Sequence, residues 1–373
     1  MRGGSRDEPG AAPRRPHRRG GLAVAAAWAV LVLAATLFAA LALNSRPAAP
    51  RTAVPHGAVS RASAVAAAVD PGLADVVCTL GYQYATSAGT GLVLTSSGEV
   101  LTNNHVIDGA TVVEVTDVGN GRTYTATVAG YDQALDIAVL KLMGASGLKT
   151  VTLGVSAKVT IGEAVIALGN AGGKGGTPSV AVGEVTSVNE SITATDAATH
   201  ASEQLTGLIR TSVPLQSGDS GGPLVTAAGT VIGMDTAAST GYEFGSGSAG
   251  GFAIPIGRAA AIAAQIESAR ASATVHLGAP GFLGVQVALY VVPFSFRAEA
   301  VVVGIVPGLP AAKAGLVPGD VIVSIAGHAV ASPSSVQALL GPYHPGDRVN
   351  VAWRDFAGRA HTATVVLATG PAV

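Results

Sequence analysis

Residues 216–224 read QSGDSGGPL and place Ser220 directly after Asp219, with glycines on both sides of this pair. Glycine reaches backbone angles that other residues avoid, so the stretch can form a sharp turn that points N–H groups inward. We expect Gly218, Asp219 and Ser220 to form an oxyanion hole there, with the N–H groups of Gly218 and Ser220 as donors. The same letters also fit a plain glycine-rich turn, so the rest of the chain decides whether Ser220 is a nucleophile.

Nucleophilic serine catalysis needs a histidine that takes the hydroxyl proton and a carboxylate that orients this histidine. His105, within VLTNNHVID, is the expected base, because His200 lies in a polar, loop-like stretch. Asp136 opens the apolar strand DIAVLKL, where a carboxylate is costly without a hydrogen-bonding partner, and is the expected orienting acid. Asp132, in a polar turn just before it, is the weaker alternative. The order His105, Asp136, Ser220 is that of the chymotrypsin architecture.

The composition limits the kinds of function that the chain can have. A length of 373 residues, with 49% hydrophobic and 12% charged residues, fits two globular units plus additional segments. The formal net charge of −1 gives no reason to expect nucleic acid as a partner. Cys78 is the only cysteine, so neither an intramolecular disulfide, a zinc–cysteine cluster nor a redox pair can form. We therefore expect no metal and no cofactor.

An uncharged apolar segment lies near the start of the chain. Residues 22–43 contain no charged residue and would span about 33 Å as a helix, enough to cross a bilayer. Several arginines precede the segment, which places the N-terminus in the cytoplasm and the rest of the chain outside. The alternative is a cleaved signal peptide, because Ala40-Leu-Ala42 has small residues at the spacing of a cleavage site. An apolar run of this length favours the membrane anchor.

The remaining chain divides by composition. Residues 1–21 indicate a disordered cytoplasmic tail, and residues 44–75, rich in proline and alanine, indicate an external linker. Residues 76 to about 253 contain many short β-branched runs separated by turn residues, which predicts an all-β barrel or sandwich, and residues 256–270 switch to helical composition at the end of this expected domain, residues 76–270. Small polar residues then mark a boundary, and residues 280–370 predict a small mixed domain.

Several motifs resemble those of the HtrA (Deg) family of trypsin-like serine proteases. In chain order they are TNNHVI (102–107), DIAVLKL (136–142), GEAVIALGNAGG (162–173), SGDSGGPL (217–224) and GFAIPI (251–256), which is also their order in the family. The resemblance implies that residues 76–270 form a chymotrypsin-like double β-barrel protease. It also implies that His105, Asp136 and Ser220 are the catalytic residues.

The C-terminal part resembles the PDZ domain of the same family. The resemblance rests on GFLGV (281–285) and AAKAGLVPGDVIVSIAG (311–327). It implies an α+β PDZ domain over residues 280–370, in which the backbone of Leu283, Gly284 and Val285 binds the carboxylate of a peptide C-terminus.

Two features of the sequence are not explained by the resemblance alone. Most HtrA sequences have asparagine where this chain has Asp219, so the partner of this carboxylate is an open question. The polar stretch Asn189–Thr206 corresponds to a regulatory loop of the family and has the composition of a mobile loop.

The expected function is that of a membrane-anchored serine endopeptidase, with its domains on the outer side of the cell membrane. It would cut misfolded or exported proteins, bind C-terminal peptides at the PDZ domain, and form a homotrimer, as the resemblance implies. The alternative is an inactive PDZ-based chaperone or scaffold at the membrane. A protease dedicated to one signalling substrate would keep the chemistry and change only the partner.

Overall fold

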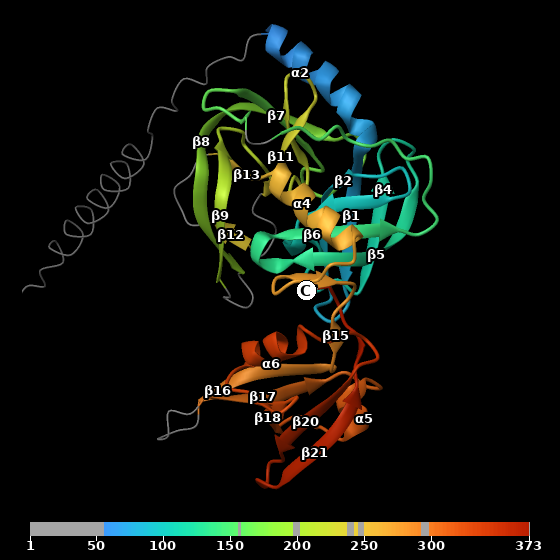
Figure 1. Cartoon of the computed structure of the whole chain (residues 1–373), viewed down its shortest axis with the longest axis vertical. Helices are drawn as coiled ribbons and strands as arrows, with labels where there is room; N and C mark the ends of the chain where they lie inside the picture. The colour runs from blue at the N-terminus through green and yellow to red at the C-terminus, as the bar shows by residue number, and fades with distance from the viewer. Residues whose placement is uncertain are drawn as a thin grey trace, which may run out of the picture. The chain divides into compact units, whose positions relative to one another are not determined.

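The computed structural model describes residues 56–155, 158–196, 202–236, 242–244, 250–291 and 298–372. Within these residues the N-terminal two-thirds forms two β-barrels and the C-terminal part forms a smaller α+β domain (Figure 1). The all-β expectation for the larger part is therefore confirmed, and the barrel replaces the sandwich.

The first barrel is a sheet in the order β14-β5-β4-β1-β2-β3-β6, closed by the pairing of β5 with β6. Its strands are β1 (Leu73–Leu80), β2 (Ala85–Val93), β3 (Glu99–Thr102), β4 (Val112–Asp117), β5 (Thr123–Asp132), β6 (Ile137–Leu142) and β14 (Val275–Leu277). The single-turn helix α3 (Asn104–Ile107) follows β3, and the 3-10 turn η2 (Gln133–Leu135) follows β5.

The second barrel is a sheet in the order β12-β8-β7-β10-β11-β13-β9, closed by the pairing of β8 with β9. Its strands are β7 (Ala164–Gly169), β8 (Ser179–Asp196), β9 (Ser202–Thr211), β10 (Pro223–Thr226), β11 (Val231–Thr236), β12 (Tyr242–Phe244) and β13 (Gly251–Pro255). The helix α4 (Ile256–Glu267) leaves this barrel after β13.

Alternating side chains explain how the first barrel closes around its own core. Along β4 and β5, Val113 pairs with Ala126 and Val115 with Tyr124, and all four are buried in one cluster. The residues between them point to the other face and are exposed or half-buried, as expected for a strand with one face in water. The sequence alternation thus fixes the register of this hairpin.

A second cluster joins the two barrels. It contains Leu101 and Ile137 from the first barrel and Met234 and Ile254 from the second, each at most 1% exposed. Leu101 lies in β3, shortly before His105, and Ile137 follows Asp136 directly. The cluster therefore packs the two barrels against each other close to the predicted site residues His105 and Asp136.

Residues 56–75, which were expected to belong to the linker, are part of the folded protein. They form the helix α2 (His56–Val69), the 3-10 turn η1 (Asp70–Gly72) and the start of β1 (Figure 1). Ala62, Val65 and Ala66 of α2 are buried in the cluster that joins the barrels. The physical reason is that alanine has a high helix propensity and a small side chain, so this segment can pack closely.

The stretch 189–206, expected to be a loop, is largely a β-hairpin. Ser191 of β8 pairs with Thr206 of β9, and Thr195 pairs with Ser202. Asn189 has a φ of 62° beside irregular register, which bends β8 at this point. The part of the stretch that contains His200, residues 197–201, lies outside the described residues.

The C-terminal domain has its own sheet and core. The sheet contains β16 (Val285–Val291), β17 (Ala298–Ile305), β18 (Val321–Ile325), β19 (His328–Ala329), β20 (Arg348–Arg354) and β21 (Ala360–Val366), and β15 (Gly281–Phe282) pairs separately with β22 (Ala368–Thr369). Two helices accompany it, α5 (Pro310–Ala314) and α6 (Pro333–Leu340). Val302, Ile322 and Val351 lie in its buried core.

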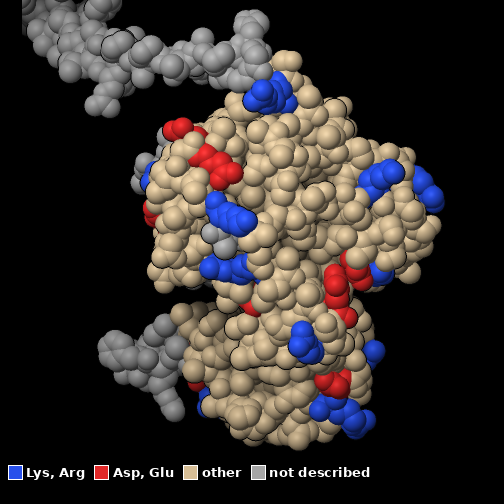
Figure 2. All heavy atoms as spheres, turned by 45° about the horizontal axis from the view of Figure 1, so that its top comes forward, with Lys and Arg blue, Asp and Glu red and all other residues tan. Residues whose placement is uncertain are grey.

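No helix among the described residues is long and apolar enough to cross a bilayer. The predicted membrane segment, residues 22–43, and the predicted tail, residues 1–21, lie outside the described residues. On the face drawn in Figure 2, basic and acidic side chains of the described residues are interspersed, in keeping with the small net charge.

Candidate active site

His105 and Asp136 form a directly hydrogen-bonded pair. The strands β3 and β6 are antiparallel neighbours with Thr102 opposite Ala138, so the end of β3 lies beside the start of β6. The ring Nδ1 of His105 lies 2.9 Å from Asp136 Oδ2 and 3.0 Å from Oδ1. The backbone N–H of His105 also donates to Asp136 Oδ1, at 2.9 Å. Both the ring and the main chain of His105 are thus fixed by one carboxylate.

The Asp136 carboxylate is buried but receives further donors. Asp136 is 4% exposed, and its backbone is in the left-handed region, with a φ of 56°. The side chain of Asn103 donates to Oδ2 and to the carbonyl oxygen of Asp136, both at 3.0 Å. The hydroxyl of Thr236, from β11 of the second barrel, donates to Oδ2 at 3.2 Å. These bonds offset the cost of burying the charge.

The turn that carries Ser220 depends on glycine at two positions. Gly218 and Gly221 have φ values of 97° and 82°, in the left-handed region that side chains avoid. A Cβ at Gly218 would collide with the carbonyl oxygen of Asn170, and one at Gly221 with that of Thr90. The glycines are therefore required both by the turn and by the close approach of other backbone.

Backbone hydrogen bonds attach this turn to both barrels. The N–H of Thr90, in β2, donates to Ser220 O at 2.8 Å, and the Thr90 hydroxyl donates to Gly218 O at 2.8 Å. On the other side the N–H of Gly221 donates to the carbonyl oxygen of Asp235, in β11, at 2.9 Å. The position of Ser220 is thus determined jointly by the first and the second barrel.

Ser220 lies close to the residue that follows His105. A Cβ built on Gly89 would lie 2.6 Å from Val106 Cγ2 and 3.0 Å from Ser220 O, so these two atoms flank the same point. The structure therefore places the backbone of Ser220 near helix α3, which carries His105, and His105 is paired with Asp136.

The three residues expected at the oxyanion hole differ in their backbone. The N–H of Asp219 donates to Gln216 O within the turn, at 3.0 Å, so it is not available to a bound oxyanion. The backbone of Asp219 is therefore not an oxyanion donor, contrary to the expectation for this residue. The N–H groups of Gly218 and Ser220 are the candidates for oxyanion donors.

The side chain of Asp219 has identifiable partners. Its Oδ2 accepts from the N–H of Gln216 at 2.8 Å, and its Oδ1 lies 3.0 Å from the hydroxyl of Ser179. Burial raises the pKa of the Asp219 carboxyl, and these two hydrogen bonds lower it by less. The partner of this aspartate is therefore within the protease domain itself.

Comparisons with known proteins agree with this geometry. Residues 89–234 match the trypsin-like peptidase domain family and residues 301–355 match the PDZ domain family. The chain is 33% identical to the serine protease Do-like HtrA of Lactococcus lactis over 298 residues, which cover 76% of this chain and 71% of that protein. The chain belongs to the HtrA family of serine proteases. It is a trypsin-like serine endopeptidase with a PDZ domain, as the resemblance implied.

Other HtrA relatives are similar over different shares of their length. The serine protease PepD of Mycobacterium tuberculosis is 31% identical over 343 residues, 88% of this chain and 69% of that protein. A probable periplasmic serine endoprotease DegP-like of Hahella chejuensis is 34% identical, and the match covers 73% of this chain but only 55% of that protein. The match thus spans 69% of the first relative and 55% of the second.

The weaker acid candidate has a structural role in this HtrA chain. Asp132 Oδ1 accepts from the N–H of Leu135 at 3.1 Å, and Oδ2 accepts from the Thr274 hydroxyl at 2.8 Å. It therefore caps the turn before β6. Within the described residues, no group of three or more His, Cys, Asp or Glu could hold a metal ion.

The predicted carboxylate loop of the PDZ domain lies between β15 and β16. Leu283 is 1% exposed and packs in the core of the domain, and its carbonyl oxygen accepts from Ala311. Gly284 has a φ of 81°, and its carbonyl oxygen accepts from Val306. Within the described residues, the N–H groups of Leu283 and Gly284 donate to no protein acceptor. This leaves backbone donors where the resemblance places a peptide carboxylate.

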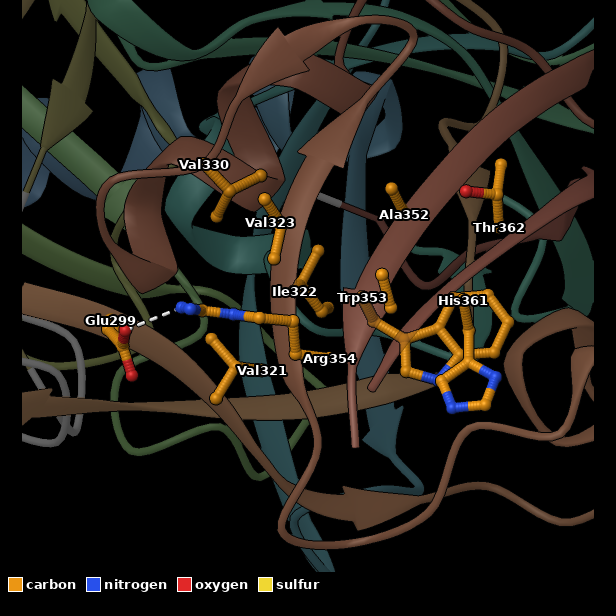
Figure 3. Close-up of a pocket in the computed structure, with 11 residues that line it drawn as sticks. Glu299, Val321, Ile322, Val323, Val330, Ala352, Trp353, Arg354, His361 and Thr362 are labelled. Atoms are coloured by element: carbon orange, nitrogen blue, oxygen red, sulfur yellow. Dashed lines mark hydrogen bonds and ion pairs between the residues drawn. The ribbon is translucent and has the colours of Figure 1, made fainter. Parts of the chain in front are cut away.

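A separate cavity of about 400 Å³ lies on the sheet of the PDZ domain (Figure 3). Trp353 stacks on His361 at 5.4 Å between ring centroids, and Arg354 pairs with Glu299 at 2.7 Å beside Val321. None of the predicted catalytic or peptide-binding residues lines this cavity, so it is not the active site.

Sequence reasoning missed Asp235 and Thr236, the two residues of β11 that contact the site. Both are 1% exposed. They end the apolar run VIGM, just as Asp136 opens another apolar run. Polar residues at the end of a buried strand were the signal that could have identified them.

Thr236 provides a first test of the site geometry. Replacing Thr236 with valine keeps the shape but removes a donor to the Asp136 carboxylate. Because a hydrogen bond to a charged group contributes roughly 1.5–3 kcal/mol, we expect kcat/KM on a peptide substrate to fall at least about tenfold. The effect should be mainly on kcat.

Thr211→Val is the matched control, because Thr211 is equally buried but contacts no carboxylate. Equal losses in Thr236→Val and Thr211→Val would show that the Thr236–Asp136 bond has no specific role.

Proposed function

We propose that this HtrA endopeptidase cuts unfolded or exported proteins with Ser220 as nucleophile, His105 as general base and Asp136 as the orienting carboxylate. The observation that supports this most is the His105–Asp136 pair, in which one carboxylate holds both the ring and the backbone of the histidine. Asp136 also keeps a left-handed backbone, a conformation that is retained where its surroundings require it. A scaffold that only binds peptides has no need of this arrangement.

The reaction follows from these positions. Because Asp136 accepts from Nδ1, the other ring nitrogen of His105 takes the proton of Ser220 as its Oγ attacks the peptide carbonyl carbon. The N–H groups of Gly218 and Ser220 stabilise the oxyanion that forms. His105 then gives the proton to the departing amine nitrogen, the C–N bond breaks, and an acyl ester on Ser220 remains. A water molecule, deprotonated by His105, hydrolyses this ester and restores Ser220.

The decisive experiment compares the solubilised full chain with its Ser220→Ala variant on casein as an unfolded substrate. Without the nucleophile, we expect the rate of casein degradation to fall by at least about 10⁴-fold. Ser212→Ala, in the same segment, is the control, because its hydroxyl accepts from the N–H of Glu184 and has no proposed role in the reaction. Degradation that survives in Ser220→Ala would contradict the proposal, as would its absence in the wild type with every activating peptide tried.

We also propose that the PDZ domain binds the C-terminus of a substrate or activator. The backbone donors of Leu283 and Gly284, and that of Val285 at the start of β16, would hold the terminal carboxylate while the peptide adds to the edge of β16. Among the described residues, β16 is an edge strand of the sheet and pairs with β17 on one side, which leaves its other side for a peptide strand.

Peptide binding can be measured by fluorescence anisotropy with a labelled peptide that ends in a free carboxylate. The same peptide with an amidated C-terminus is the matched control. Loss of charge-assisted hydrogen bonds should weaken binding by about tenfold or more. Equal affinity for the two peptides would exclude a carboxylate site at this loop.

We further propose that residues 22–43 anchor the chain in the cell membrane, with the protease and PDZ domains on the outer side. The support is the uncharged apolar sequence, the arginines before it and the periplasmic location in the name of one relative.

Protease added to intact spheroplasts should then degrade both domains, and the full chain should stay in the membrane pellet after alkaline carbonate extraction. Protection of both domains would reverse the proposed orientation. The homotrimer that the family resemblance implies stays a prediction.

A further inference from the structure

A second acidic residue lies directly behind the Ser220 turn. The N–H of Gly221 donates to Asp235 O at 2.9 Å, and the N–H of Asp235 donates to Gly222 O at 2.7 Å. Asp235 is 1% exposed, and neither oxygen of its carboxyl group has a hydrogen-bond partner among the described residues. A buried carboxylate without a partner is costly, so this group needs a proton or a compensating charge.

Asp219, whose charge acts on Asp235, has no cationic partner of its own among the described residues. The N–H of Gly222 donates to Asp219 O at 2.9 Å, so one glycine connects the backbones of Asp219 and Asp235. The Ser179 hydroxyl lies 3.0 Å from Asp219 Oδ1 and 2.9 Å from Gly169 O, and its single proton can serve only one of them. Within the described residues, no lysine or arginine pairs with either aspartate.

The other charged groups on the surrounding elements are engaged elsewhere. His105 and Asp136 pair with each other and reach β11 only through Thr236. Arg210, on the strand next to β13, lies over the ring of Phe252. Burial, and then the negative charge of Asp219, raise the pKa of the Asp235 carboxyl well above its ordinary value. Two carboxyl groups that interact in this way titrate as a pair.

We propose that Asp219 and Asp235 hold one negative charge between them, with the proton on Asp235, and that loss of this proton displaces the Ser220 turn. A second buried charge repels the first, and Asp219 relieves the repulsion by leaving Ser179 and Gln216. Because Asp219 directly precedes Ser220, its movement changes the positions of the oxyanion donors. The consequence for catalysis depends on the proposed role of Ser220, whereas the sharing of one charge does not.

The catalytic consequence is tested by the pH dependence of kcat on a peptide substrate. Wild-type activity should fall as the pH rises through the pKa of Asp235. Asp235→Asn cannot ionise and should retain at high pH the activity that it has at neutral pH. Asp117→Asn is the matched control, because Asp117 is also buried with a raised pKa but lies at the end of β4 in the first barrel. It should keep the wild-type alkaline loss.

Unfolding provides a readout that does not require activity. The unfolded chain loses this proton at a pH of about 4, and the folded chain keeps it to a higher pH, so stability decreases as the pH rises between the two pKa values. The Ser220→Ala substitution is used as the background because it prevents self-cleavage, and unfolding is measured with urea. Over this pH window the unfolding constant of Ser220→Ala should rise more steeply than that of Ser220→Ala/Asp235→Asn, by up to about tenfold per pH unit.

The outcomes separate the two proposals. Parallel pH dependences of the two unfolding constants would overturn the carboxyl pair, as would an alkaline loss of kcat that Asp235→Asn does not change. An inactive wild type with a difference between the unfolding constants would instead contradict the proposed function and support the pair.

Discussion

Two backbone hydrogen bonds, one from Thr90 to Ser220 and one from Gly221 to Asp235, determine where the serine of this protein lies. Each bond comes from a different barrel, so the turn exists in its present shape only while the barrels are packed together. The cluster that contains Leu101, Ile137, Met234 and Ile254 supplies this packing. Burial of these four large side chains contributes, at about 1.5–3 kcal/mol for each, on the order of 10 kcal/mol before the entropy of ordering is subtracted.

The same division between barrels appears at the carboxylate of Asp136. The first barrel supplies Asn103 and His105, and the second supplies the Thr236 hydroxyl. Without these donors, the buried carboxylate would lose the hydrogen bonds that offset the cost of its burial and would hold the His105 ring less firmly. Catalytic electrostatics and barrel packing therefore depend on the same contacts.

The sequence was sufficient for the features that local chemistry determines. The short β-branched runs and the family motifs predicted the two barrels, and His105 and Asp136, which the sequence singled out, are hydrogen-bonded as a pair. It was not sufficient where long-range pairing decides. The partner of Asp219 is Ser179, which lies on a different strand of the second barrel, and residues 189–206 are strands because β8 and β9 close that barrel. Helix α2 was missed because an alanine-rich segment near prolines has the composition of a linker.

The attachment of the Ser220 turn to both barrels also limits how the enzyme can be regulated. A shift of the second barrel does not need a chain of side chains to reach the proposed nucleophile, because the main chain of β11 is hydrogen-bonded to Gly221 itself. The shape of the turn therefore depends on how the two halves of the protease domain are aligned. For such a protein, a change in the packing of one barrel would also move the proposed oxyanion donors.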